Sequence, residues 1–146
     1  MPDASPLRLD DARGHAVRLD APPRRIVSLV PSQTELLAHL GLDGETVGLT
    51  RFCTRPGGWK DEKEIVGGTK NVRVEKVEAL QPDLVLANRE ENTREVVEAI
   101  EGVAPVFVTE VPGVAAAAAM IRDVGRLTGR SGQATALAER PSPQRA

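Results

Sequence analysis

Most side chains of this 146-residue sequence that could recognise another molecule lie in loops that follow short apolar runs. Asn88 and Arg89 come after one such run and offer an amide and a guanidinium, which hydrogen-bond polar or anionic groups. Lys70 adds a positive charge in another loop, and Phe52 adds a flat apolar face in a third. Amides, cations and an aromatic ring are groups that hold a ligand. The loop chemistry therefore predicts binding before it predicts catalysis.

Residues that could catalyse a reaction or hold a metal ion have no partner at a suitable spacing. Cys53 is the only cysteine, and a thiol nucleophile needs a base, which no neighbouring motif supplies. His15 and His39 lie far apart in sequence, and neither has a second ligand at the spacing of a metal site. We therefore expect no metal site and no enzyme, with an enzyme that uses Cys53 kept as a third reading.

The stretch 25–41 predicts the elements that position the first binding loop. Residues 26–30 are almost all apolar, as in a buried strand, and Pro31 breaks that strand. Ser32 and Glu35 have the spacing of a helix capping box, and Gly41 can end the helix. A strand that turns into a helix leaves backbone N–H groups at the edge where open α/β sheets bind ligands. The residues expected at this edge are Pro31, Ser32 and Gln33. Ser32 is expected to cap the helix rather than to contact the ligand.

Strands and helices are expected to alternate along the chain. Further strands are predicted at 46–50, 83–87 and 105–109, and helices at 74–80, 92–100, 114–127 and from 131 onward. The helix at 92–100 has Asn92 and Glu95 as its expected cap pair. Nearly continuous apolar strands are typical of a parallel sheet that is covered on both faces. The predicted fold is an α/β, Rossmann-like three-layer lobe with a mostly parallel four-stranded sheet and helices on both faces.

Three parts of the chain are distinguished. Residues 1–24 are predicted to form an N-terminal arm with a hairpin, and residues 25–130 the lobe itself. Residues 131–146 begin another helix, which the prolines at 141 and 143 end. No segment approaches the roughly 20 apolar residues that span a bilayer. Residues 1–20 show no apolar core of a secretory signal, so the cytoplasm stays open as the compartment.

Composition argues against nucleic acid as a partner. The formal net charge is −2, and the aromatic residues are two Phe, one Trp and no Tyr. A base-stacking surface needs aromatic platforms interleaved with positive charge, and a nucleic-acid footprint needs a basic patch. We therefore expect a small molecule or a protein as the partner.

Four motifs in fixed order resemble a known family. They are RIVSLVPSQTE at 25–35, VGLT at 47–50, GGT at 67–69 followed by Glu75, and ALQPDLVLA at 79–87. Together they resemble the N-terminal lobe of the substrate-binding proteins of cobalamin and iron-siderophore ABC importers, in which one rigid helix joins two lobes. The resemblance covers about residues 11–139 and implies a single lobe without the second one.

The resemblance implies a solute receptor that acts outside the cytoplasmic membrane, closes two lobes on a ligand and delivers it to an ABC permease. The implied ligand is a cobalamin-like corrinoid or a ferric siderophore, with no cofactor required. Pro31 and Phe52 fit places where cobalamin receptors present aromatic residues. Lys70 and Asn88 stand where one type of cobalamin receptor carries tryptophan. Lys70 would suit an anionic ligand, such as a ferric chelate or a phosphate-bearing corrinoid. Glu75 matches a surface glutamate that meets permease arginines, and helix-dipole compensation is its other reading.

The sequence leaves alternatives to an importer function open. The main one is a cytoplasmic small-molecule-binding or dimerising interaction protein on the same fold, without a role in import. An exposed interlobe face could also drive self-association. Ordinary turn chemistry is the other reading of the loop residues. The residues predicted to bind the ligand are Pro31, Ser32, Gln33, Phe52, Lys70, Asn88 and Arg89.

Overall fold

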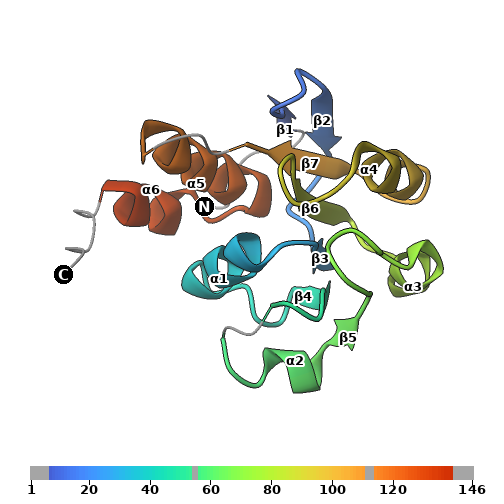
Figure 1. The fold of residues 1–146 in the computed structure, drawn as a ribbon. Helices are drawn as coiled ribbons and strands as arrows, with labels where there is room; N and C mark the ends of the chain where they lie inside the picture. Colours follow the sequence, from blue (N-terminus) through green and yellow to red (C-terminus); the bar gives the residue numbers. More distant parts are fainter. Residues whose placement is uncertain (1–6, 54–55, 111–113, 140–146) are drawn as a thin grey trace.

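A parallel sheet of five strands lies at the centre of the computed structural model, which describes residues 7–53, 56–110 and 114–139 (Figure 1). Its strands, in spatial order, are β5 (Glu64–Ile65), β4 (Thr46–Leu49), β3 (Ile26–Ser28), β6 (Leu84–Asn88) and β7 (Val106–Thr109). Every neighbouring pair is parallel. The α/β class and the parallel sheet are confirmed. The predicted count of four strands is wrong, because β5 has two residues and is too short to show an apolar pattern.

Helices cover both faces of the sheet and give the predicted three layers (Figure 1). One face carries α1 (Pro31–His39), α5 (Val114–Thr128) and α6 (Ser131–Glu139). The other carries α3 (Val74–Leu80) and α4 (Arg94–Glu101). A single turn, α2 (Trp59–Glu62), lies beside β5. None of the helices in the described ranges is both long and apolar enough to cross a membrane.

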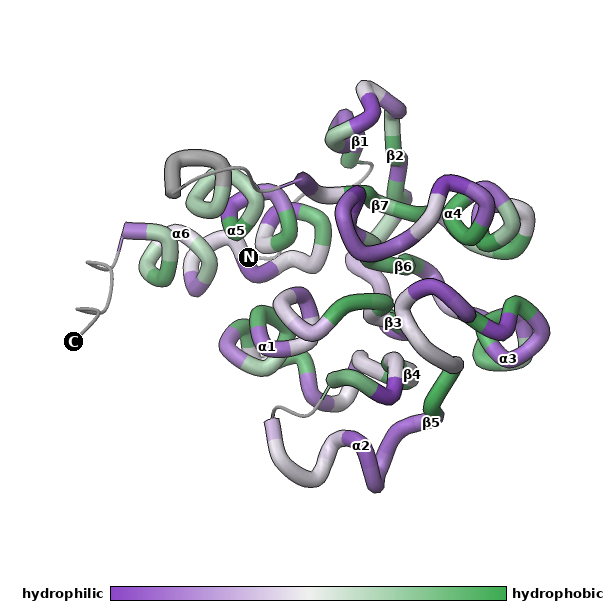
Figure 2. Tube along the Cα trace, in the orientation of Figure 1, coloured by the Kyte–Doolittle hydropathy of each residue, from purple (hydrophilic) through white to green (hydrophobic). Residues whose placement is uncertain are grey.

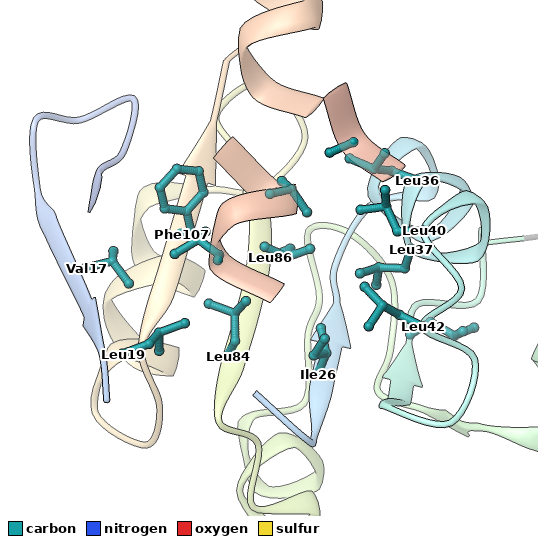
Figure 3. Packing of buried hydrophobic residues seen from close by; sticks show 14 of the residues in the cluster. Val17, Leu19, Ile26, Leu36, Leu37, Leu40, Leu42, Leu84, Leu86 and Phe107 are labelled. Atoms are coloured by element: carbon teal, nitrogen blue, oxygen red, sulfur yellow. The ribbon is translucent and has the colours of Figure 1, made fainter. Parts of the chain in front are cut away.

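The core divides into two clusters because successive side chains of a strand point to opposite faces. Leu84 and Leu86 of β6 belong to the cluster under α1, α5 and α6, whereas Val85 and Ala87 belong to the cluster under α3 and α4. Figure 3 shows the first cluster extending from the hairpin through the sheet to α1. In Figure 2 the strands β6 and β7 are mostly hydrophobic, while the loop between β6 and α4 is hydrophilic. The polar residues thus gather where the strands end.

The predicted N-terminal hairpin is present and protects one edge of the sheet. Its strands β1 (Leu7–Asp10) and β2 (Ala16–Leu19) are antiparallel, and their turn contacts β7. The N–H of Val108 donates to Oδ2 of Asp11 at 3.1 Å, and the N–H of Ala12 donates to the carbonyl of Val108 at 2.8 Å. The turn therefore supplies hydrogen bonds that a further strand would make with β7.

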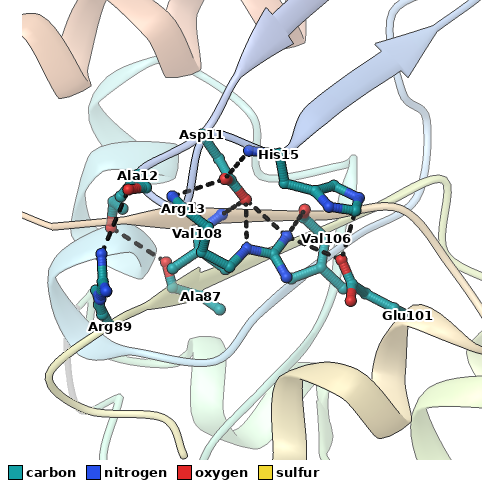
Figure 4. A network of polar contacts seen from close by, with 10 residues as sticks. Asp11, Ala12, Arg13, His15, Ala87, Arg89, Glu101, Val106 and Val108 are labelled. Atoms are coloured by element: carbon teal, nitrogen blue, oxygen red, sulfur yellow. Dashed lines mark hydrogen bonds and ion pairs between the residues drawn. The ribbon is translucent and has the colours of Figure 1, made fainter. Parts of the chain in front are cut away.

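Asp11 is the centre of a polar network in this turn (Figure 4). Its side chain is fully buried and accepts bonds from the N–H groups of Arg13 and His15 and from the guanidinium of Arg13, whose Nη2 lies 2.7 Å away. Burial alone would raise the pKa of Asp11, but these bonds and the one from Val108 together hold the pKa below its ordinary value. Glu101, 2.8 Å from Arg13, completes the network and helps to raise the pKa of Arg13 against the effect of burial.

The predicted cap of α1 is wrong. Val30 is the N-cap and Pro31 the first helical residue, so Ser32 lies inside the first turn and no side chain caps the helix. Proline suits this position because its missing N–H would have no partner there. The strand before it ends at Ser28 rather than at residue 30. Gly41 ends the helix as predicted, with φ of 74° in the left-handed region.

The predicted cap of α4 is also wrong. The helix begins at Arg94, and Thr93 caps it by accepting a hydrogen bond from the N–H of Val96 at 3.1 Å. Asn92 therefore lies one residue before the cap, and its side chain is used elsewhere. The helix predicted from residue 131 is present as α6. Residues 1–6 of the predicted arm and 140–146 of the predicted tail lie outside the described ranges.

Candidate ligand-binding edge

The carboxyl ends of parallel strands meet at one edge of a sheet, so the loops after β3, β4, β5 and β6 are brought together here. The described contacts between these loops agree with that. The amide of Asn92 donates to the carbonyl of Thr69 at 2.8 Å, and Nζ of Lys70 donates to the carbonyl of Glu91 at 3.1 Å. The residues predicted to bind a ligand thus lie in neighbouring loops, although not all of their side chains are exposed.

Phe52, in the loop after β4, is the one large apolar side chain that is exposed among the described residues, at 55%. The guanidinium carbon of Arg51 lies 5.5 Å from the centroid of its ring. A Cβ on Gly68 would come within 3.3 Å of the ring and 3.1 Å of Nη2 of Arg51, so a larger residue would crowd both side chains. The edge therefore offers a flat apolar face beside a cation.

Lys70 and Arg89 are exposed cations of this edge with different partners. Lys70 donates to a backbone carbonyl, which leaves its charge uncompensated by that contact. Nη1 of Arg89 lies 3.5 Å from a carboxylate oxygen of Glu110. It also donates to the carbonyl of Ala12 at 3.4 Å (Figure 4). Of the two predicted cations, Lys70 is thus better placed to attract an anionic group.

Gln33 and Asn88 are turned into the protein. Gln33 is fully buried, and its Nε2 donates to Oγ1 of Thr109 at 2.6 Å, while its Oε1 has no partner among the described residues. Asn88 is 8% exposed, and its Oδ1 accepts from the N–H groups of Glu90 and Glu91 at 2.9 and 3.1 Å. These two amides shape the loops from below. On the outside, Ser32 is exposed and Pro31 is half-buried.

A hollow of about 530 Å³ lies beside the edge, between the hairpin turn and α4. Its cationic lining residues are Arg13, Arg89 and Arg94. The carboxylates within 3.5 Å of these guanidinium groups are those of Asp11, Glu101, Glu110 and Glu98. Because carboxylates neutralise the arginines, we place the candidate binding surface at Phe52 and Lys70 rather than in this hollow.

Cys53 is fully buried, and its contacts are with hydroxyl groups. Oγ1 of Thr34 donates to its sulfur at 3.0 Å, and Oγ1 of Thr50 lies 3.3 Å from it. Neither hydroxyl can serve as the base that a thiol nucleophile needs. Within the described ranges, no three His, Cys, Asp or Glu side chains gather as a metal ion would require. The geometry gives no support to the reading that uses Cys53 for catalysis.

Glu75 lies in the first turn of α3 with its side chain 71% exposed. Its nearest described ionic contact is Nη1 of Arg73 at 3.9 Å, a weak pair at an exposed position. Both readings of this residue therefore remain physically open, since it complements the helix dipole and is accessible to a partner.

Comparison with known proteins gives a consistent set of relatives. Residues 26–141 match the family model described as periplasmic binding protein. The uncharacterized ABC transporter substrate-binding lipoprotein YvrC of Bacillus subtilis is 45% identical over 83 residues, which cover 57% of this chain and 26% of YvrC. A cobalamin-binding protein of Halobacterium salinarum is 33% identical over 136 residues, which cover 90% of this chain and 36% of that protein.

Among solved structures, the heme binding protein HmuT aligns with a TM-score of 0.81 at 27% sequence identity. The alignment covers 95% of this chain and 46% of HmuT. The chain thus spans less than half the length of each of these three relatives.

Proposed function

Because the chain belongs to the periplasmic binding protein family, we propose that it forms one lobe of the substrate-binding component of an ABC importer. The family is the one expected from the sequence motifs. Its members are binding proteins rather than enzymes, so the expectation of a non-catalytic role is confirmed. The lobe would hold its ligand at the carboxyl edge of the sheet, facing a second lobe of the same receptor. Such a receptor acts outside the cytoplasmic membrane.

We infer that the ligand is a metal-carrying chelate or macrocycle with a flat apolar part and negative charge. The single observation that carries this inference is the exposed Phe52 ring, with Arg51 beside it and Lys70 in a neighbouring loop. A flat ring system could stack on Phe52, while carboxylate or phosphate groups would pair with the cations. Relatives named as cobalamin-binding and heme-binding support this class. Corrinoids, heme and ferric siderophores are the candidates within it.

Titration calorimetry of cobalamin, cobinamide, heme and a ferric siderophore tests this proposal. Each ligand would be titrated into the chain and into a protein that carries the chain together with a second lobe. Phe52→Ala should weaken binding about tenfold through lost stacking, and Lys70→Ala about three- to tenfold through a lost charge. Lys76→Ala is the matched control, since Lys76 lies on α3 and pairs with Glu64. Absence of binding by both proteins would favour the cytoplasmic interaction protein over the importer.

The permease is the proposed protein partner, and Glu75 is its proposed contact. An exposed carboxylate that meets arginines forms a charge-assisted pair, which sets orientation and association rate. Glu75→Lys should lower the ligand-stimulated ATPase activity of the transporter without changing ligand affinity. Glu78→Lys, an exposed change later in the same helix, is the control. Equal loss in both variants would point to net charge rather than to a contact at Glu75.

A further inference from the structure

Asn92 joins three loops of the ligand-binding edge although only 4% of it is exposed. Its Nδ2 donates to the carbonyl of Thr69 at 2.8 Å and to the carbonyl of Leu29 at 3.3 Å. Its Oδ1 accepts from the N–H of Asn88 at 2.9 Å. Leu29 follows β3, Thr69 follows β5 and Asn88 ends β6. One buried side chain thus contacts the loops after three strands, and all of its polar atoms are used.

The loop that carries Asn92 is itself closed by hydrogen bonds. The N–H of Asn92 donates to the carbonyl of Asn88 at 2.9 Å. The side-chain bond between the same residues runs in the other direction, from the N–H of Asn88 to Asn92. Oδ1 of Asn88 accepts from the next two free N–H groups of the turn, those of Glu90 and Glu91. Lys70 adds a link from the loop after β5 to the carbonyl of Glu91. The backbone between residues 88 and 92 is therefore fixed at both ends and at its middle.

The contacts select asparagine at position 92. Aspartate could still accept from the N–H of Asn88, but its second oxygen would face the carbonyls of Thr69 and Leu29 without a proton to share. Alanine would leave all three backbone groups without this partner in a buried place, where an unmade hydrogen bond is costly. Glutamine would place the amide one methylene farther out. A donor and an acceptor at this reach are both required.

We propose that Asn92 is a positioning residue that holds the loops after β3, β5 and β6 as one rigid unit. Through these loops it fixes where Lys70 stands, so that a ligand meets a prearranged cation and loses less ordering entropy on binding. The inference rests on the proposed function only in this last step. The linkage between the loops stands on the contacts of Asn92 alone.

Amide hydrogen exchange followed by NMR tests the linkage without any ligand. In Asn92→Ala, the amide of Asn88 loses its acceptor and should exchange about tenfold faster, relative to amides at the centre of β6. The amides of Arg51 and Arg73, which donate to the carbonyls of Gly67 and Val66 in the loop after β5, should also exchange faster. In Asn92→Asp at neutral pH, Asn88 should keep its protection while Arg51 and Arg73 lose theirs.

Thr93→Ala is the matched control, because it removes the neighbouring helix cap and not the loop contacts. The amide of Val96 should exchange faster in this variant, and those of Arg51 and Arg73 should not change beyond the global loss of stability. Uniform acceleration of all amides in Asn92→Ala, as in a merely destabilised fold, would overturn the linkage. So would unchanged protection of Asn88.

Ligand affinity then separates the linkage from the proposed function. If the parent protein binds heme, cobalamin or a ferric siderophore, Asn92→Ala should bind it about tenfold more weakly and Thr93→Ala about as tightly as the parent. Equal affinity of Asn92→Ala and the parent would refute the positioning role at the site. If the parent binds none of them, the proposed function fails, while the exchange data still decide whether Asn92 joins the loops.

Discussion

Replacing Asp11 with asparagine should strongly weaken the contact between the hairpin turn and β7. The aspartate accepts from the N–H of Val108 and from the guanidinium of Arg13 through the same oxygen, Oδ2. In Asp11→Asn, either the amide nitrogen takes this place and faces those donors, or the amide flips and meets the N–H groups of Arg13 and His15 instead. In both orientations the NH2 group of the asparagine faces other N–H donors in a buried place. The outer edge of the sheet would lose its closing contact.

The size of the effect follows from these contacts. A hydrogen bond to a charged group is worth about 1.5–3 kcal/mol, and breaking a buried ion pair costs about 3–5 kcal/mol. The lower end applies because Arg13 keeps Glu101 as a partner and its side chain is 24% exposed. We therefore expect a loss of about 3 kcal/mol in the free energy of unfolding. With a typical urea dependence, the midpoint should fall by about 1–2 M.

Urea denaturation followed by tryptophan fluorescence measures this loss. Trp59 is the only tryptophan and is buried, so its emission reports the folded state. Asp10→Asn is the control, since it removes the same charge from an exposed neighbour in β1. If Asp11→Asn unfolds at the same urea concentration as Asp10→Asn, the turn does not stabilise β7 and the reasoning is refuted.

The remaining predictions concern the acid dependence of stability and substitutions in the backbone. The pKa of Asp11 is lowered in the fold, so the contribution of Asp11 to the free energy of unfolding is present above its unfolded pKa of about 4 and is lost as the pH falls through the native pKa. Acid unfolding of Asp11→Asn should therefore show a flatter pH dependence below pH 4. Gly125→Ala would place a Cβ against the Cβ of Ala134 and should cost about 1–3 kcal/mol in thermal unfolding, whereas Gly132→Ala in open space should stabilise slightly. Gln81→Gly should raise the unfolding free energy by about 0.5–1 kcal/mol, since Gln81 has φ of 51°, and unchanged or lower stability would contradict this.

Local patterns predicted most elements of the fold but not their spatial order. Nearly continuous apolar runs identified β3, β4, β6 and β7, because strands buried on both faces must be apolar along their length. The position of β3 between β4 and β6 depends on pairing between Ile26 and Leu84, which are far apart in sequence. Local patterns could not predict the contact of Asp11 with Val108, 97 residues apart, for the same reason.

The sequence identified the loops of the candidate site better than the orientation of their side chains. Asn88 and Gln33 are amides at the candidate binding edge, yet both turn inward, where Thr109 receives a hydrogen bond from each. Asn92 has the spacing of a helix cap, but its tertiary contacts with Leu29 and Thr69 outweigh that local preference. The missed signal was a pair of asparagines four residues apart directly after an apolar strand.

The buried Cys53 can report when the structure around it opens, because its thiol becomes accessible to reagents only then. As the only cysteine, it is the only group with which a thiol reagent would react, and Thr34 and Thr50 enclose its sulfur. In a molecule that stays folded, this thiol is therefore shielded from oxidants and from disulfide exchange with other molecules. Any fraction that is modified at Cys53 or linked through a Cys53 disulfide consists of molecules that have opened at least around Cys53. The growth of that fraction over time measures how often this part of the chain opens.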